Sequence, residues 1–574
     1  MGKFQRPVKI RDSQALAPPG RILRLKSNSG GASSRGPVIF AGFCLPSGLE
    51  PLIILPGSQK NVNSGFTSMK VHLTTLHVGR GTSTMIEPGS GRKPVSALPI
   101  RRSDWRQRVM RLLLAIFLVM PVFGARAGVV FTTIYSFTNG NDGPTYPLTA
   151  LVQGSDGYLY GTTSGGFGTV FQISTNGVLT ILYAFNGGND GAGSSGLVQG
   201  SDGDFYGTTS DGGTNNVGTV FQLSTNGGLT SWHSFTGIDG EYPSAALVQG
   251  SDGDFYGTTS GGGVHANQFG QGGTVFQINT NRVFASLYSF TGGDDGYDPS
   301  GLVPGSDHSF YGTTTYGGSH TNQFGGTYGT VFKISTNGQL TTLYAFGTVT
   351  NANGEPLDGA NPQGGLVQGS DGDFYGTTSA GGTNNVGTVF QLSTNGGLTS
   401  LHSFTGIDGE QPSAALVQGS DGNFYGTTFG GGTNQDGAVF KISTNGQFTT
   451  LYAFGTVTNA NGEPLDGANP QGGLVQGSDG SFYGTTTYGG VGGGTVFRLT
   501  IVPEFQAVTL TNSTLSLTWS TEAGGVYQLQ YNSDLSSTNW INLNGPAKAT
   551  GATLSTTDSL TNGPQRFYRL ALSP

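Results

Sequence analysis

The stretch LVQGSDGDFYGTTS occurs three times in this sequence, at residues 197–210, 247–260 and 366–379. Close variants begin at four further positions, Leu151, Leu302, Leu416 and Leu474. A single active site needs its residues only once, whereas a structural unit is written once for every copy, so the pattern indicates a repeat. Successive copies lie 46, 50, 55, 64, 50 and 58 residues apart, which is about the length of one β-propeller blade.

Each repeat contains four short runs that are rich in Val, Thr, Phe and Tyr, the composition of β-strands. We name these runs a to d; in the first repeat they are 149–154, 158–163, 168–174 and 179–185. Ser-Asp-Gly joins a to b and Thr-Asn-Gly joins c to d, and such Asp-Gly or Asn-Gly pairs supply the positive φ angles of tight hairpin turns. Each repeat is therefore predicted to form a four-stranded antiparallel sheet.

The ends of the array distinguish a ring from a row of sheets. The seventh repeat has runs a, b and c but no run d, whereas FTTIYSF at 131–137 has the d pattern and precedes the first run a. Pairing of this early segment with the last run c would join the two ends of the array. We therefore predict an all-β, seven-bladed β-propeller over 128–502 that is closed by its N-terminal strand, in preference to a linear β-solenoid.

The recurring L-V-x-G-x-D-G-x-F-Y-G-T-T and G-T-V-F patterns, from about 131 to 500, resemble the GloVer repeat of exported bacterial proteins with interchangeable anchors. The resemblance implies an exported repeat protein and assigns no activity. Residues 503–574 leave the repeat and alternate with period two, which predicts a small β-sandwich. This tail resembles a fibronectin type III-like module, with Trp519 and Tyr531 as core rings and Tyr568 in its last strand. Trp540 is interpreted as core packing rather than sugar contact.

The segment 110–127, MRLLLAIFLVMPVFGARA, has a basic start, an apolar run and an Ala-Arg-Ala ending. It reads as a secretory signal peptide cleaved before Gly128, and its apolar run is shorter than the roughly 20 residues of a membrane span. Residues 1–109 are interpreted as non-native sequence upstream of a true start at Met110, or alternatively as a disordered leader. No transmembrane segment is predicted in the mature chain, which we expect to be secreted or on the cell surface of a bacterium.

Acidic residues dominate the part of the chain after the signal. Seven of the 26 Lys and Arg residues but 29 of the 33 Asp and Glu residues follow residue 127, so the mature net charge is near −22. Such a surface repels a phosphate backbone, which excludes nucleic acid as an expected partner. The single cysteine, Cys44, precedes the signal, so the mature protein is expected to have no disulfide.

Loop length varies only between runs b and c and between run d and the next run a. An antiparallel meander places these loops on one side of the disc, and variable loops on a rigid scaffold commonly carry function. Nine rings of these loops are candidate ligand-binding residues: Phe167, His265, Phe269, Tyr316, His320, Phe324, Tyr328, Phe429 and Tyr488. The alternative is that they plug the channel or pack on neighbouring loops.

Every d-to-a loop contains an Asp-Gly pair: Asp142, Asp190, Asp239, Asp295, Asp358, Asp408 and Asp466. Each Asp is expected to bond its own downstream backbone in an Asx turn, and the Asp of Ser-Asp-Gly, such as Asp202, is likewise interpreted as a fold element. A structural calcium ion is the alternative role, because carboxylates suit this cation. Asp294, Asp295 and Asp298 form the best local cluster for calcium, and no other cofactor is expected.

Signals for catalysis are sparse. The five histidines after the signal do not form a metal-binding spacing, and His233 and His402 occupy equivalent places in two repeats. The favoured function is an exported, non-enzymatic binding or surface scaffold protein whose partner is an extracellular polysaccharide or a surface protein. The alternatives are a carbohydrate-active lyase or glycosidase on the loop side, and a structural surface-layer or adhesion element.

Overall fold

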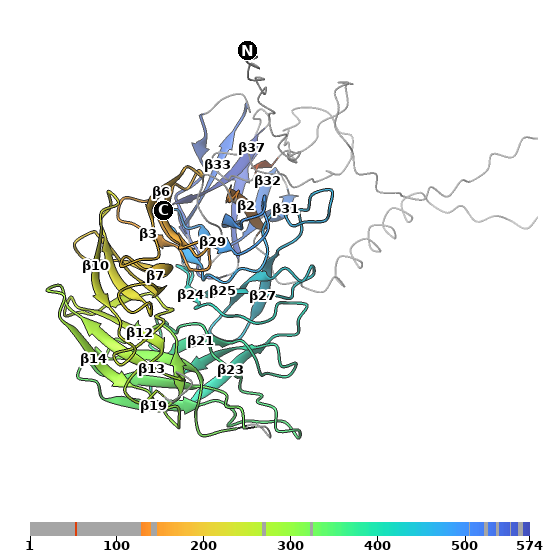
Figure 1. The fold of residues 1–574 in the computed structure, drawn as a ribbon. Helices are drawn as coiled ribbons and strands as arrows, with labels where there is room; N and C mark the ends of the chain where they lie inside the picture. Colours follow the sequence, from red (N-terminus) through yellow and green to blue (C-terminus); the bar gives the residue numbers. More distant parts are fainter. Residues whose placement is uncertain are drawn as a thin grey trace, which may run out of the picture.

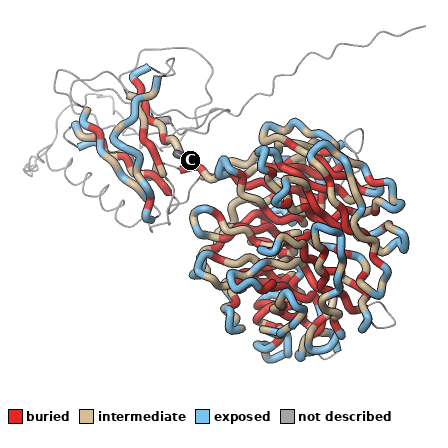
Figure 2. Tube along the Cα trace, turned by 90° about the vertical axis from the view of Figure 1, so that its left-hand side faces the viewer, coloured by how far each residue is buried: buried red, intermediate tan, exposed pale blue. Residues whose placement is uncertain are grey.

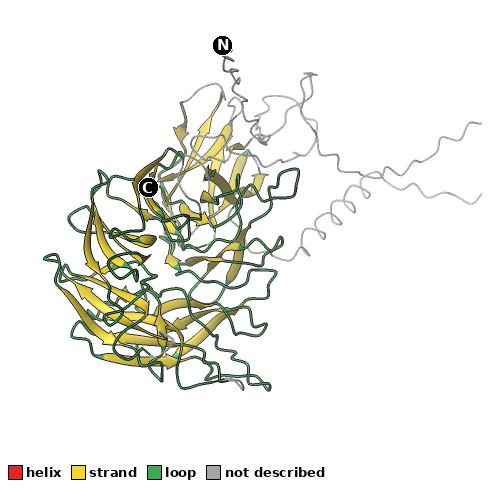
Figure 3. Cartoon of the chain, in the orientation of Figure 1, coloured by secondary structure: helices red, strands yellow, loops and turns green. Residues whose placement is uncertain are grey.

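The structure of the protein is a computed structural model. It describes residues 52–53, 128–138, 146–266, 271–321, 325–503, 505–511, 513–521, 526–534, 539–551, 553–560 and 566–573. Strands provide all the regular secondary structure within these ranges, and turns connect them (Figure 3). The 1–109 segment beyond residues 52–53 and the 110–127 signal lie outside the described residues.

The strands of residues 128–502 form seven antiparallel sheets, here called blades 1 to 7, whose strand order follows runs a to d (Figure 1). Blade 1 consists of β3 (Val152–Gln153), β4 (Leu159–Thr163), β5 (Thr169–Ile173) and β6 (Leu179–Ala184). Blade 2 consists of β7 (Ala192–Gln199), β8 (Phe205–Asp211), β9 (Thr219–Leu223) and β10 (Leu229–Ser234). Blade 3 consists of β11 (Val248–Gln249), β12 (Phe255–Gly261), β13 (Gln271–Ile278) and β14 (Phe284–Ser289).

Blade 4 contains a divided run a, with β15 (Tyr297–Pro299), β16 (Val303–Pro304), β17 (Phe310–Tyr316), β18 (Thr330–Ile334) and β19 (Leu340–Ala345). Blade 5 consists of β20 (Val367–Gln368), β21 (Phe374–Thr378), β22 (Thr388–Leu392) and β23 (Leu398–Ser403). Blade 6 consists of β24 (Val417–Gln418), β25 (Phe424–Thr428), β26 (Ala438–Ile442) and β27 (Phe448–Ala453). Blade 7 consists of β28 (Val475–Gln476), β29 (Phe482–Thr486), β30 (Thr495–Val502) and β2 (Gly128–Ser136).

The outer strand of blade 7 comes from the beginning of the array. β2 pairs antiparallel with β30, in a register that runs from Gly128 opposite Val502 to Ser136 opposite Thr495. A cluster of buried side chains that includes Leu159 of blade 1 and Tyr483 of blade 7 joins these two blades. The predicted pairing of the segment after residue 127 with the last run c is confirmed, and β2 lies beside strands from the other end of the array in Figure 1.

Aromatic rings fill the junctions between successive blades, where each hydrophobic cluster combines side chains of two neighbouring sheets. Figure 2 shows the buried residues inside the propeller and the exposed ones at its rim. The Tyr of run b in one blade packs on the Phe of run b in the next, as with Tyr160 on Phe205 at 4.0 Å between ring centroids. Five further junctions repeat this contact at 3.9–4.2 Å. At the closing junction Leu159 takes the place of the Phe, and both Leu159 and Tyr483 are fully buried. The Tyr-Phe contact therefore joins the blades at six of the seven junctions, and a Tyr-Leu contact joins them at the seventh.

The turns between runs a and b differ from the prediction. Gly154 and Gly157 close the turn with a bond from the Gly157 N–H to the Gly154 carbonyl at 2.9 Å, and of the three loop residues 155–157 only Gly157 has a positive φ, at 85°. The Asp-Gly pair thus forms a three-residue loop with one left-handed residue, not a two-residue turn with two. The Asp156 side chain supports this loop, since it accepts bonds from the Tyr158 N–H and the Tyr160 hydroxyl.

A glutamine latch links neighbouring blades on this turn side. The Gln of LVQGSDG accepts a hydrogen bond through Oε1 from the N–H of the Ser in the preceding blade, at 2.8–3.0 Å. Its Nε2 donates to the hydroxyl of the same Ser and to the carbonyl of the Gly in its own turn. The latched pairs are Ser155–Gln199, Ser201–Gln249, Ser306–Gln368, Ser370–Gln418, Ser420–Gln476 and Ser478–Gln153.

The innermost runs approach each other closely enough to restrict their side chains. A Cβ atom on Gly196 would lie 2.9 Å from the Cβ of Ala246, and one on Gly473 would lie 3.0 Å from the carbonyl oxygen of Ala415. This position, directly before the Leu of each repeat, is always Gly or Ala. Small residues here let the inner strands of neighbouring blades converge.

The tail forms the predicted β-sandwich. One sheet contains β31 (Phe505–Thr511), β32 (Thr514–Ser520) and β36 (Thr553–Ser559); the other contains β33 (Val526–Asn532), β34 (Ile541–Asn542), β35 (Ala547–Lys548), β37 (Phe567–Ser573) and β1 (Leu52–Ile53). Trp519 and Tyr568 are buried in its core, and Tyr531 packs against that core. Trp540 is half-buried instead, with the Arg569 guanidinium 4.3 Å from its ring. The fibronectin type III-like assignment stays a prediction.

Candidate functional site

The aspartates of the d-to-a loops hold those loops to the outer strand. In the loop that connects blade 4 to blade 5, Asp358 accepts hydrogen bonds from the Tyr344 hydroxyl at 2.6 Å and from the N–H groups of Gly347 and Thr348. Asp190, Asp295 and Asp466 likewise each accept a Tyr hydroxyl and at least one backbone N–H. Burial first, and then the bond to Asp190, raises the pKa of Tyr183 to about 12, so the ring remains a neutral donor.

This arrangement corrects the predicted direction of the Asp contacts. The N–H donors precede the Asp by three or more residues, so the carboxylate bonds upstream backbone and closes the loop, whereas an Asx turn bonds downstream. Asp142 lies outside the described residues. The architectural role itself fits the structure, because each described Asp of this set accepts a backbone N–H through at least one carboxylate oxygen. Among the described residues, Asp190 Oδ1 is buried without a hydrogen-bond partner.

The predicted calcium cluster does not gather around a common point. Both oxygens of Asp295 accept protein hydrogen bonds, and Asp298 bonds the side chain of Thr315. Burial raises the pKa of Asp298 to about 6, an environment that disfavours its ionised form. Over the described ranges, no group of three or more His, Cys, Asp or Glu side chains is arranged to hold a metal ion. Calcium binding by Asp294, Asp295 and Asp298 therefore gains no structural support.

The two equivalent histidines replace the tyrosine of run d. His233 Nε2 lies 2.9 Å from Asp239, and His402 Nε2 lies 2.9 Å from Asp408. The His402 ring stacks on Phe448 of the next blade at 3.8 Å between centroids. Burial lowers the pKa of His402 although Asp408 acts in the opposite direction. These histidines thus hold the loop as the tyrosines do elsewhere.

The predicted ligand-binding rings are distributed around the loop side. Tyr316 is 38% exposed and stacks on Tyr297, while Tyr488 is 48% exposed and meets Tyr146 edge to face. Phe167 is exposed and its ring lies against Gly187. Among the described rings, Tyr316 and Tyr488 thus belong to two separate ring pairs.

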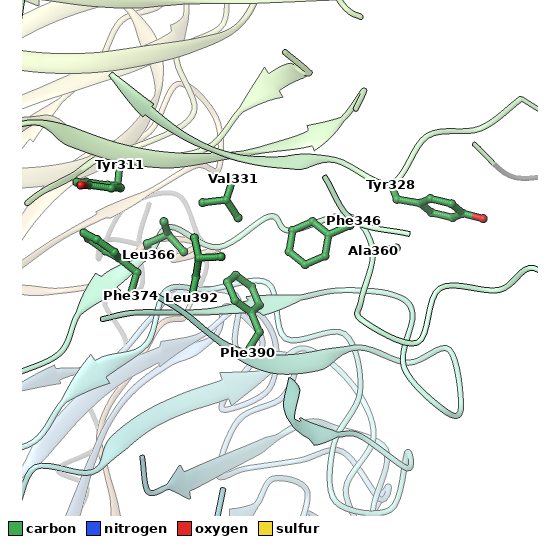
Figure 4. Close-up of a cluster of buried hydrophobic side chains, with 9 residues drawn as sticks. All are labelled: Tyr311, Tyr328, Val331, Phe346, Ala360, Leu366, Phe374, Phe390 and Leu392. Carbon is green, nitrogen blue, oxygen red and sulfur yellow. The ribbon is translucent and has the colours of Figure 1, made fainter. Parts of the chain in front are cut away.

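The remaining predicted rings differ in their surroundings. Tyr328 is buried and belongs to the hydrophobic cluster between blades 4 and 5, with its hydroxyl directed away from the other side chains in Figure 4. His265 bonds the carbonyl of Ser289, and His320 is half-buried near Gly347. Tyr328 is loop packing, as the alternative interpretation predicted. Phe269 and Phe324 lie outside the described residues.

One of the predicted rings, Phe429, lines a pocket. This pocket, of about 350 Å³, lies on the loop side and is formed by the ends of run b and the d-to-a loops of blades 5, 6 and 7. We call it the amide pocket; its lining residues are Gln363, Ser379, Ala380, Gln411, Ser413, Phe429 and Gln471. Three carboxamides and two hydroxyls thus surround one half-buried aromatic ring.

Sequence reasoning missed the polar residues of the amide pocket. Gln363, Ser413 and Gln471 each directly follow a proline. Their sequence signal is a constant position, because each lies shortly before the Leu that begins the repeated phrase of run a. Gln411 precedes its proline and has a left-handed backbone with φ of 53°. These residues could not be grouped from sequence because they belong to three repeats, and only the ring arrangement places them together.

No helix in the described part of the chain is long and apolar enough to cross a membrane. The predicted signal at 110–127 lies outside the described residues.

Known structures with a similar arrangement have low sequence identity to this chain. The extracellular domain of a putative hybrid two-component system from B. thetaiotaomicron is 12% identical, with a TM-score of 0.42; the match covers 77% of this chain and 55% of that one. PorZ, a bacterial surface component of the type-IX secretion system of Porphyromonas gingivalis, is 12% identical, with a TM-score of 0.41 and coverage of 76% and 56%. The WD40 β-propeller domain of Doa1 is 10% identical, with a TM-score of 0.39 and coverage of 65% and 96%. This chain therefore spans just over half the length of the first two proteins.

A comparison with curated proteins finds no match. A family model, described as the Gloeobacter/Verrucomicrobia repeat, matches residues 164–357 and 321–532, which together cover more than half of the chain. The matched residues begin in blade 1 and extend into the sandwich, and they contain the a-to-b turns and the Phe-Tyr residues of blades 2 to 7 described above. The chain therefore belongs to the Gloeobacter/Verrucomicrobia repeat family.

Proposed function

We propose that this protein is an exported binding protein that recognises an extracellular polysaccharide in the amide pocket. The observation that carries the proposal is the lining of this pocket, where Gln363, Gln411 and Gln471 face the same space as the Phe429 ring. Carboxamides both donate and accept hydrogen bonds, which matches the hydroxyl groups of sugars. An aromatic ring offers an apolar face to the C–H groups of a sugar ring.

Phe429 departs from the repeat at this position. Four other repeats have Ser here, at Ser164, Ser210, Ser260 and Ser379, and the remaining two have Thr. The ring is therefore not needed to build a blade. A half-buried aromatic side chain that the fold does not require supports a role in ligand contact.

The chemistry of the pocket favours binding over catalysis. Among the described residues, its lining contains no Asp, Glu, His, Lys, Arg, Tyr or Cys. Glycoside hydrolysis needs a pair of carboxyl groups on either side of the scissile bond, and a lyase needs a general base. The amide pocket supplies neither, so the lyase or glycosidase alternative is not favoured at this site.

Export is part of the proposal, and its support is the apolar run of 110–127 with its Ala-Arg-Ala ending. Expression of the full chain in a bacterium, followed by fractionation and N-terminal sequencing, tests it. The expected product is extracytoplasmic and begins at Gly128. A product that stays in the cytoplasm with residues 110–127 intact would refute export but would leave the binding proposal open.

Binding is tested with a glycan array, followed by calorimetry on each retained glycan. Phe429→Ser restores the residue of four other repeats, so this variant is expected to fold. Loss of the stacked ring should weaken binding about tenfold, since about 1.4 kcal/mol corresponds to one decade in affinity. Gln411→Ala and Gln471→Ala should each weaken it further in the same assay.

Phe167→Ser is the matched control, because it removes an exposed ring from a loop of blade 1 outside the pocket. It should retain the affinity of the wild type. The proposal is wrong if the array retains no glycan, or if Phe429→Ser and Phe167→Ser bind with equal affinity.

A further inference from the structure

The glutamine latch fails at one junction, between blades 3 and 4. Run a of blade 4 reads Leu-Val-Pro-Gly, so Pro304 replaces the Gln that should accept the Ser251 N–H. The same turn departs from the repeat a second time, because His308 replaces the Gly and takes the left-handed conformation with φ of 62°. Both departures flank one small region on the turn side of the disc, opposite the loops that form the amide pocket.

The missing glutamine leaves three polar groups without their usual partner. In the six latched junctions, Gln bonds the Ser N–H, the Ser hydroxyl and the carbonyl of the turn Gly. At this junction the equivalent groups are the Ser251 N–H, the Ser251 hydroxyl and the His308 carbonyl. Pro304 has no side-chain carboxamide that could form hydrogen bonds with them. Among the described residues the Ser251 N–H and the His308 carbonyl form no hydrogen bond, and Ser251 Oγ lies 3.5 Å from His308 Nδ1.

A pocket of about 260 Å³ occupies this place. Ser251 and Asp252 of blade 3 line one side, and Pro304, His308 and Thr336 of blade 4 line the other. Asp252 accepts the Tyr256 hydroxyl and the Asp254 N–H, so it is committed to its own turn. The pocket therefore presents a donor, a hydroxyl and an acceptor in the arrangement that a glutamine side chain fills elsewhere.

We propose that this pocket binds the side-chain carboxamide of an Asn or Gln residue presented by another polypeptide. The carboxamide oxygen accepts the Ser251 N–H, and the amide nitrogen donates to the Ser251 hydroxyl and the His308 carbonyl, as the protein's own glutamines do at the other junctions. The partner's Asn or Gln side chain thus takes the place of the glutamine that Pro304 replaces in this repeat.

The geometry selects a primary carboxamide over related groups. Oε1 and Nε2 of each latch contact the same serine, so the oxygen and one N–H must lie on the same edge of the amide. A trans secondary amide, such as the N-acetyl group of an amino sugar, has its oxygen and N–H on opposite edges. A carboxylate has no proton to donate to the His308 carbonyl. A protein partner is therefore favoured over a glycan at this pocket.

The test uses the full chain labelled with ¹⁵N and the probe acetyl-Gly-Gln-Gly-N-methylamide, whose only primary amide is the Gln side chain. A saturable shift of the Ser251 amide resonance is expected. The matched peptides with Glu or with Nε-methylglutamine should bind at least tenfold more weakly. Absence of a saturable Ser251 shift, or equal shifts with the Glu peptide, would overturn the proposal.

Pro304→Gln restores the residue of the other six repeats and is the decisive variant. Its own glutamine should fill the pocket, so probe binding should weaken at least tenfold while the midpoint temperature of unfolding rises. Probe binding that persists in Pro304→Gln would place the contact elsewhere and contradict the proposal. Glycan binding at the amide pocket should be unchanged in this variant, so the two proposals fail independently.

Discussion

The Oε1 atom of Gln153 accepts a hydrogen bond from the N–H of Ser478 at 2.8 Å, although the two residues are 325 positions apart. The same bond joins neighbouring blades elsewhere, with separations of 44–62 residues. Blades 7 and 1 are thus joined by the contact that joins sequential blades, together with the pairing of β2 and β30. A continuous ring gives the loops of blades 5, 6 and 7 the fixed spacing on which the amide pocket depends.

Gln153→Ala should lower the free energy of unfolding by about 1–2 kcal/mol, because it leaves the Ser478 N–H without its acceptor. Urea unfolding followed by tryptophan fluorescence measures this loss. Gln199→Ala removes the same bonds between blades 1 and 2 and should cost a similar amount. Loss of stability in Gln199→Ala alone would show that the Gln153 latch does not form.

Thr132→Pro should destabilise the protein by about 3 kcal/mol or more, since proline removes a ladder N–H and disturbs the pairing of β2 with β30. Thr180→Pro is the matched control: Thr180 pairs with Gln172 in blade 1 as Thr132 pairs with Arg498 in blade 7. Calorimetric unfolding should give similar decreases for both variants. A wild-type midpoint in Thr132→Pro would mean that β2 does not close blade 7.

His402→Tyr should reduce the dependence of stability on pH. Burial lowers the pKa of His402 in the folded state, so the unfolded chain binds more protons as the pH falls below about 6.5. The wild type should therefore lose stability on acidification from pH 7.5 to 5.5. Tyr occupies the equivalent place in blades 1, 3, 4 and 6, where it donates to the Asp that corresponds to Asp408. The variant should therefore fold, and its free energy of unfolding should depend less steeply on pH. Equal slopes in urea titrations would contradict this account.

Asp298→Asn should raise stability at pH 7.5 by an amount on the order of 2 kcal/mol. Burial raises the folded-state pKa of Asp298 to about 6, above its unfolded value near 3.9, so ionisation costs stability as the pH rises through this window. Asn361 and Asn469 occupy the equivalent position before proline, with φ of 54° and 53°, so Asn suits this backbone. The gain should vanish at pH 4. A gain that is equal at both pH values would assign it to a cause other than the charge.

The sequence allowed the blade arrangement to be predicted because each repeat carries its own contacts. The Phe-Tyr pair and the Gln and Ser of the turn recur in register, so a contact between neighbours is written several times. The absence of run d from the seventh repeat predicted the pairing of β2 with β30. The turn geometry was less predictable, because Asp-Gly serves both two-residue and three-residue loops.

The candidate sites depend on departures from the repeat, and their sequence signals differ in strength. Pro304 and His308 are visible as exceptions in an aligned repeat, as is Phe429 among serines and threonines. Tyr328 gave the same aromatic signal but is buried in the cluster with Phe346 and Ala360, because the folding of its loop decides its exposure. Loop conformation between blades is a tertiary property, so it could not be deduced from residue type.

Hydrogen–deuterium exchange of the full chain with its bound glycan tests the central claim most directly. The amide pocket account predicts slower exchange on binding in three d-to-a segments, 361–365, 411–415 and 469–473, and at the end of run b around Phe429. The equivalent segments of blades 1 to 3 should exchange at an unchanged rate. Protection confined to other blades, with none in these three segments, would contradict the assignment of the amide pocket as the binding site.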